Sequence, residues 1–152
     1  MSTVKNGFEQ PRTPDNDDNA PYLEGELTPQ IIGYSIAAGG ANVCEVTLTV
    51  RDGHGATIAK AMNFDLSLSD DSAGAGLTAT SASGTVQAKS GEGADIGIYT
   101  AKKALRVQTK ADGTYTLEIT DSAKTGFYVA AQLPFSGLLT VSRQLVTGDY
   151  GT

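Results

Sequence analysis

The stretch that decides the fold is residues 104–120, ALRVQTKADGTYTLEIT, in which two alternating segments flank the turn sequence Lys110–Gly113. Leu105 and Val107 share one face of the first segment, as the period of two of a half-buried strand requires. The second segment alternates in the same way, with Tyr115, Leu117 and Ile119 on one face. Asp-Gly between two such runs is typical of a tight turn, because glycine takes the positive φ that the turn needs. We therefore expect a β-hairpin here.

Comparable patterns on both sides of this stretch predict further strands. They lie at residues 31–37, 43–50, 57–68, 96–100, 127–131 and 138–146. The segment 43–50, VCEVTLTV, alternates cleanly, so Cys44 is interpreted as a small buried apolar residue. It is joined to 57–68 by the turn Asp52–Gly55, which predicts a second hairpin. About eight strands that mostly follow one another as a meander favour an antiparallel two-sheet sandwich over a single core.

Residues 70–95 have a different character. Fifteen of these 26 residues are Gly, Ala or Ser, and only Leu77 and Val86 are aliphatic beyond alanine. We expect a long loop with at most short strands, which is either functional or held at an interface, or else a solvated insertion. Lys102 and Lys103 follow the next strand and are interpreted as protection of a sheet edge rather than as ligands.

The first thirty residues form a separate unit in composition. Six acids against two bases give residues 1–30 a balance of −4, out of −6 for the whole chain of 152 residues. Four prolines and a polar run at 15–19 indicate an extended arm that cannot fold alone. We therefore divide the chain into an N-terminal arm, 1–30, and a sandwich domain, 31–152. Isolated apolar residues in the arm are its candidate interaction residues: Val4, Phe8, Tyr22, Leu23 and Leu27.

Composition disfavours several classes of function. Eleven scattered Lys and Arg residues in an acidic chain give no footprint for a phosphate backbone, so we expect no nucleic-acid partner. No apolar run reaches 18 residues, and the N-terminus lacks the apolar core of a signal peptide, so we expect no membrane partner and synthesis in a cytoplasm. A single cysteine cannot form an internal disulfide and leaves the redox compartment open.

No catalytic, cofactor or metal site is predicted. The only histidine, His54, lies in a tight turn and has no nucleophile motif beside it. Residues 69–72 and 121–122 offer oxygen ligands but lack the spacing of a calcium loop, and the glycines of 84–97 lack the strand and helix of a phosphate loop. The aromatic residues of the predicted strands are interpreted as core and cross-strand pairs rather than a sugar shelf: Tyr34, Phe64, Tyr99, Tyr115, Phe127 and Tyr128.

Two blocks carry a family resemblance. They are VCEVTLTVRDGHG (43–55), followed by FDLSLSDDSAGAGLTATSASG (64–84), and GIYTAKKALRVQTKADGTYTLEITDSAKTGFYVAA (97–131). The second resembles the DGxYxLxI pattern of immunoglobulin-like repeats in bacterial surface and phage proteins. The order of blocks up to LTVSRQLVTGDYG resembles small virion proteins of tailed bacteriophages, over residues 43–151. The resemblance implies an immunoglobulin-like sandwich of about 7–9 strands and a non-enzymatic building block, and it supplies no catalytic residues.

On this basis the first hypothesis is a capsid decoration or cement protein on the surface of the virion. Its partners would be the major capsid protein and other copies of itself, expected as a homotrimer, with the arm lying across capsid subunits. A tail, head-to-tail or head-fibre component would use the same arm. A module that binds a host glycan or surface protein is the second class of function, and an accessory domain of a secreted hydrolase is the third.

Overall fold

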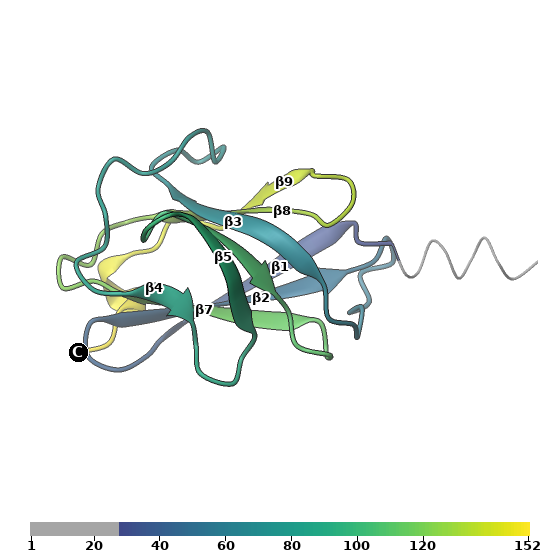
Figure 1. The fold of residues 1–152 in the computed structure, drawn as a ribbon. Helices are drawn as coiled ribbons and strands as arrows, with labels where there is room; N and C mark the ends of the chain where they lie inside the picture. The colour runs from purple at the N-terminus through teal and green to yellow at the C-terminus, as the bar shows by residue number, and fades with distance from the viewer. Residues whose placement is uncertain (1–27) are drawn as a thin grey trace, which may run out of the picture.

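The computed structural model describes residues 28–152 and shows an all-β fold of two antiparallel sheets packed face to face (Figure 1). The first sheet has the order β1-β2-β7-β4, formed by Ile31–Ala38, Val43–Arg51, Thr114–Thr120 and Val86–Ala88. The second has the order β5-β6-β3-β8-β9, formed by Ala94–Thr100, Ala104–Gln108, Asn63–Ser69, Tyr128–Gln132 and Leu139–Val141. A 3₁₀ turn, η1, spans Thr147–Asp149. The predicted β-sandwich is confirmed.

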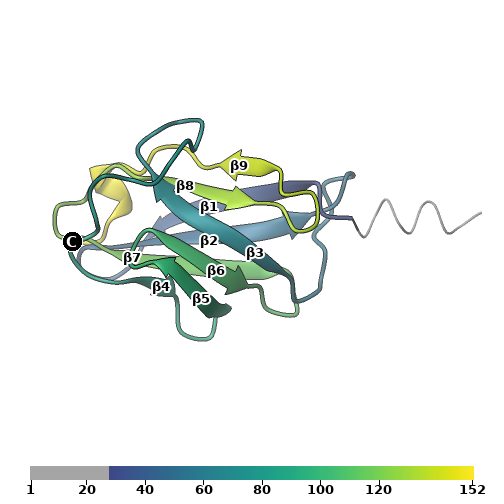
Figure 2. The ribbon, with the colours of Figure 1, turned by 45° about the horizontal axis from the view of Figure 1, so that its top comes forward.

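The strand order is that of an immunoglobulin-type sandwich. β1, β2, β7 and β4 stand in the places of the four-stranded sheet of that fold, and β3, β8 and β9 in those of the opposite sheet. β5 and β6 extend the second sheet beyond β3, and Figure 2 shows β5 at that edge. The nine strands of the described chain fall within the predicted range.

The core forms where the alternating faces meet between the sheets. Cys44, Val46, Leu48 and Val50 of β2 are fully buried, as the pattern of 43–50 predicts. In the register of β2 with β7, their neighbours are the predicted inward residues of the second alternating segment: Cys44 pairs with Ile119, Val46 with Leu117 and Leu48 with Tyr115. From the opposite sheet Phe64 meets the ring of Tyr115 edge to face, with centroids 6.4 Å apart.

The hairpin prediction for 104–120 is wrong, although the turn itself is present. Two backbone hydrogen bonds close the turn, from Lys110 N to Thr114 O and from Gly113 N to Lys110 O. Beyond it, β6 pairs with β5 and β3, whereas β7 pairs with β2 and β4 in the other sheet. The connection is an arch between sheets, because both edges of each strand are already paired within its own sheet.

The second predicted hairpin is an arch of the same kind. β2 and β3 belong to different sheets, and β3 begins at Asn63 rather than at residue 57. Only the first residues after the turn pair back onto β2, through the Arg51–Thr57 bridge and the bond from Ile58 N to Val50 O. Meandering connections remain at β1-β2, β5-β6 and β8-β9.

Side-chain hydrogen bonds close both open sides of the sandwich. On one side the Tyr34 hydroxyl of β1 donates to the carbonyl oxygen of Thr140 in β9, at 3.0 Å. On the other, Asp95 of β5 accepts a 2.7 Å bond from the Tyr115 hydroxyl and a 2.9 Å bond from the Ala88 amide of β4. Burial, and then the bond to Asp95, raise the pKa of Tyr115. The two sheets therefore hold a fixed relation at both edges.

Candidate interaction surface

Large exposed apolar side chains gather around the outer face of the five-stranded sheet. Four of the nine in the described chain line hollows on this face: Leu77, Tyr99, Phe135 and Leu139. The outer face of the four-stranded sheet carries small and hydroxyl residues instead, such as Ser35, Thr47 and Thr116. Exposed apolar side chains that line hollows are typical of an interaction surface.

A polar cluster occupies the middle of this face. The guanidinium of Arg106 on β6 donates to Asp65 on β3 at 2.7 Å, and the hydroxyl of Tyr99 on β5 donates to the same oxygen at 3.0 Å. The bond to Asp65, and then the one to Tyr99, raise the pKa of Arg106. Three strands thus fix one charged pair, which can orient a polar partner but is largely solvated.

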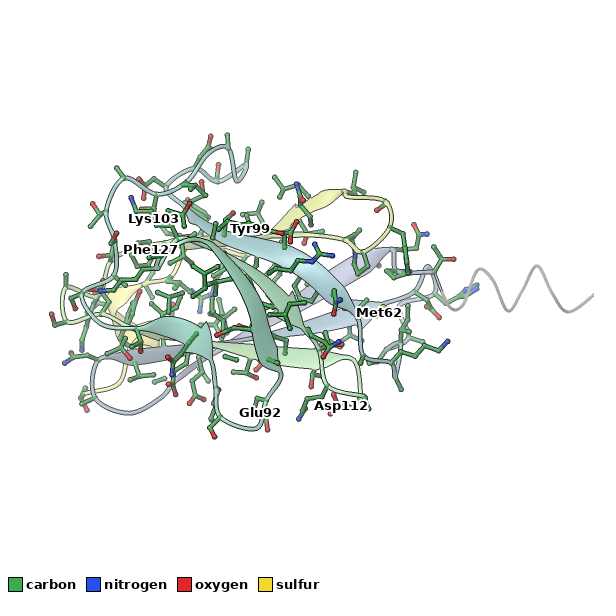
Figure 3. The ribbon with its side chains drawn as sticks, in the orientation of Figure 1. Met62, Glu92, Tyr99, Lys103, Asp112 and Phe127 are labelled. Atoms are coloured by element: carbon green, nitrogen blue, oxygen red, sulfur yellow. The ribbon has the colours of Figure 1, made fainter. Side chains whose placement is uncertain are left out.

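One hollow, the first hollow, lies beside this cluster, under the loop that follows β3. It encloses about 270 Å³, and Tyr99, Leu77 and Leu139 form its apolar walls. Asp65 and Gln132 supply polar groups from the sheet below. Figure 3 shows Tyr99 on the side of the sheet that faces this loop.

The loop over the first hollow is pinned at several points. Asp70 accepts a 2.6 Å bond from the Thr78 hydroxyl and a 2.8 Å bond from the Ala79 amide, and these bonds lower the pKa of Asp70 in that order. The Lys103 ammonium donates to the carbonyl of Ala79 at 3.1 Å, and Lys102 donates to the carbonyls of Ala82 and Ser83. The two lysines therefore hold the loop, a role different from the predicted edge protection.

Another hollow, which we call the Phe135 groove, lies toward the end of the sandwich at which the described chain begins. It encloses about 340 Å³, and its lining consists of Ala61, Met62, Asn63, Arg106, Gln108, Pro134 and Phe135. Phe135 is 89% exposed and has a φ of 69°. A non-glycine residue with positive φ is strained, and such strain is concentrated at sites of function. Figure 3 places Met62 toward this end.

Neither Tyr99 nor Phe135 was assigned to a surface by the sequence. Tyr99 is 61% exposed, so its assignment to the core is wrong, whereas Phe64, Tyr115 and Phe127 are buried as predicted. The sequence of residues 96–100 indicated this exposure, because Tyr99 does not share the alternation of Ile96 and Ile98 and therefore falls on the opposite face of the strand. β5 also has two register shifts. For Phe135 the signal was an aromatic residue directly after the proline of a predicted turn.

The oxygen ligands considered for calcium serve the backbone instead. Asp121 is 1% exposed and accepts bonds from the amides of Thr125 at 2.8 Å and Ser83 at 3.0 Å. Burial alone would raise the pKa of Asp121, but these hydrogen bonds outweigh it and lower the pKa to about 2. Within residues 28–152 no three His, Cys, Asp or Glu side chains are grouped to hold a metal ion.

The remaining sequence predictions can be placed briefly. His54 lies in an exposed turn, where its amide donates to Asp52 at 2.8 Å. The loop predicted at 70–95 contains only β4 and the start of β5. The candidate arm residues Val4, Phe8, Tyr22, Leu23 and Leu27 lie outside the described residues. No helix in the described part is long and apolar enough to span a membrane.

Comparison with known proteins adds nothing to this geometry: no protein-family model, no curated protein and no solved structure matches the chain.

Proposed function

We propose that this chain is a non-enzymatic structural protein of a bacteriophage virion, of the capsid decoration or cement type. It would attach to the major capsid protein through its N-terminal arm and the adjoining end of the five-stranded sheet. The observation that carries the proposal is that the β8-β9 connection, which contains Phe135, lies at the end of the sandwich where the described chain begins (Figure 1). The resemblance of residues 43–151 to small virion proteins supports it.

Two attachment elements at one end fit the way a cement protein must work. An extended arm loses conformational freedom when it binds, so one arm with a few apolar contacts attaches weakly. An oligomer that engages several arms at once gains overall affinity without any new type of contact. A homotrimer on the capsid surface satisfies this requirement and leaves the opposite end of the sandwich, with the C-terminus, facing outward.

Attachment can be tested by sedimentation. Purified protein is mixed with capsids assembled without it, and the bound fraction is measured against concentration. We expect saturable binding that is lost when residues 1–27 are deleted and weakened by Phe135→Asn. Absence of binding to such capsids would refute the proposed cement role. Binding to isolated tails instead would favour the tail or head-fibre role, which would use the same end of the molecule.

A second candidate, a module that binds a host glycan, is favoured by the hollow beside Tyr99. An exposed aromatic ring next to the Asp65–Arg106 pair and Gln132 offers a stacking surface together with donors and acceptors for sugar hydroxyls. Saturable binding of the isolated chain to host polysaccharide, abolished by Tyr99→Ala, would support the glycan-binding function. Binding that Tyr99→Ala leaves unchanged would exclude this hollow as the glycan site.

A further inference from the structure

The hollows on the outer face of the five-stranded sheet join into one groove. A smaller hollow, of about 180 Å³, connects the first hollow with the Phe135 groove. It shares the lining residues Asp65 and Gln132 with the first hollow. With the Phe135 groove it shares Asn63, Arg106 and Phe135. The lining is therefore continuous from the loop after β3 to the β8-β9 connection, and we call the joined hollows the sheet groove.

The sheet groove runs along β3. Tyr99 lines its first part and Met62 its last, and Figure 3 shows these side chains well apart along the sheet. Ser67 and Asn63 of β3 line the same two parts, and the rise of a strand places them about 13 Å apart. The two larger hollows, of about 270 and 340 Å³, are each near the lower limit of small-ligand pockets, roughly 300 Å³. A ligand that fills the whole groove is therefore a chain of linked units.

The sheet groove presents side-chain amides that are open to a ligand. Asn63 of β3 lies opposite Gln108 of β6, and both line the Phe135 groove. Gln132 of β8 lines the first hollow. Within residues 28–152 no side-chain hydrogen bond involves these three amides, whereas the amide of Gln144 donates to the carbonyl of Gly126. A side-chain amide both donates and accepts, so these groups suit a ligand rich in hydroxyl groups.

The charge of the sheet groove favours an uncharged ligand. The charged residues of its lining are Asp65 and Arg106, which pair with each other at 2.7 Å. An anion or a cation in the groove therefore meets no net charge of opposite sign. The other polar side chains of the lining are amides and the hydroxyl groups of Ser67 and Tyr99.

The backbone under the sheet groove offers little to a peptide. An extended peptide that recognises a sheet gains affinity mainly by adding a strand to an open edge. β6, β3 and β8 lie inside the order β5-β6-β3-β8-β9, so each is paired on both edges. A ligand in the groove is therefore recognised by side chains.

An aromatic ring stands at each end of the polar lining. Tyr99 borders the first hollow, and the bond from its hydroxyl to Asp65, at 3.0 Å, fixes the ring before a ligand binds. Phe135 borders the other end and is exposed. A sugar ring has apolar faces of C–H groups, which pack on an aromatic ring, and a rim of hydroxyl groups, which bond to amides. Linked sugars therefore match both the ends and the middle of the groove.

We propose that the sheet groove binds an uncharged oligosaccharide that lies along β3. Its sugar rings pack against Tyr99 and Phe135 at the two ends. Its hydroxyl groups bond to the amides of Asn63, Gln108 and Gln132. Such a site rests on the glycan-binding function named above and extends it from the first hollow to several linked sugars. Because the cement role uses the same Phe135 end, the full groove belongs to chains that are not attached to a capsid.

A glycan array probed with the purified full chain tests the class and the length of the ligand. The array carries uncharged and anionic oligosaccharides of bacterial surfaces, each from monosaccharide to hexasaccharide. We expect binding to uncharged chains that strengthens with length by roughly 10-fold or more, because added units reach further hydrogen bonds. Stronger binding of the anionic set would overturn the proposal. Equal binding of monosaccharide and hexasaccharide would overturn the extended groove but leave the glycan-binding function, whereas no binding of any saccharide would refute both.

Variants at exposed positions separate the two parts of the sheet groove. Gln108→Ala, remote from Tyr99, should weaken hexasaccharide binding by roughly 3- to 10-fold, the effect of about one hydrogen bond. Tyr99→Ala should weaken it by roughly 10-fold or more, through loss of the stacking surface. The matched control is Gln87→Ala, which removes an exposed amide from β4 in the other sheet. Equal effects of Gln87→Ala and Gln108→Ala, in variants with unchanged melting curves, would overturn the proposal.

Nuclear magnetic resonance of the unsubstituted protein gives a readout that needs no variant. Each side-chain amide gives its own pair of signals in a nitrogen–proton correlation spectrum. Titration with the tightest-binding oligosaccharide of the array should shift the signals of Asn63, Gln108 and Gln132 and leave those of Gln87 and Gln144 in place. Shifts confined to Gln132 would restrict the ligand to the first hollow, and shifts centred on Gln87 would place it on the other sheet. Either result would overturn the proposal.

Discussion

Asp121→Asn removes one carboxylate that holds three parts of the sandwich together. The carboxylate lies where β7 ends, and it accepts hydrogen bonds from the amides of Thr125 at 2.8 Å, Ser83 at 3.0 Å and Ala123 at 3.3 Å. These bonds fix both the β7-β8 connection and the loop segment that leads to β4. Asparagine has the same shape, but its amide nitrogen turns a donor toward one of these donors. We therefore expect a less stable but correctly folded protein.

The pKa shift gives the size and the pH window of the effect. The pKa of Asp121 falls from an ordinary value of 3.8 to about 2 in the folded state. At about 1.36 kcal/mol per pKa unit, this shift corresponds to about 2 kcal/mol of folding free energy. Because the folded pKa is the lower one, the contribution is complete above pH 4 to 5 and is lost as the pH falls toward 2. For a domain of this size it equals roughly 8 °C in Tm.

Urea unfolding followed by circular dichroism, from pH 7 down to pH 2, measures this contribution. The parent protein should be more stable than Asp121→Asn at pH 7, and the two should converge near pH 2, where a protonated Asp resembles Asn. Asp112→Asn is the matched control. The Asp112 carboxylate, like that of Asp121, accepts hydrogen bonds, but from one residue, Thr114, and it is exposed. The difference in stability between the parent protein and Asp112→Asn should therefore change less with pH. A parent-to-variant gap that stays constant across this pH range would refute the assignment.

Three further predictions concern the arm, the groove and the turn. Deletion of residues 1–27 should leave the Tm of the sandwich within a few degrees while abolishing attachment to capsids, and a large loss of Tm would contradict the division into arm and domain. Phe135→Asn should keep the free energy of unfolding in urea or raise it by up to about 1 kcal/mol through relief of strain, while it weakens binding. A strongly lowered free energy of unfolding would show that the ring is structural. Gly113→Ala should destabilise the folded protein by more than about 1 kcal/mol, because the φ of Gly113 is 82° and an added Cβ would collide with the backbone of Ile58. An unchanged melting curve would contradict that packing.

The local pattern predicted the strands well because burial on one face requires alternation. Cys44 and its alternate neighbours in 43–50 are fully buried, and the bounds of β1, β2 and β8 lie within a residue or so of the prediction. The pattern predicted burial wrongly where the alternation of apolar residues does not coincide with burial. β5 is an edge strand with two register shifts, so Tyr99 turns outward although it lies in an apolar run.

The sequence by itself determined that this protein is an all-β sandwich with a chemically separate acidic arm, since periodicity and composition are local properties. It could not determine the partner of each strand. Residues 104–120 have the same pattern in a hairpin and in an arch, and only the competition of β2, β3, β4 and β5 for the two segments decides between them. The tertiary structure also places the β8-β9 connection at the end of the sandwich where the described chain begins, because the directions of β1 and β8 are set by their partners in each sheet (Figure 1).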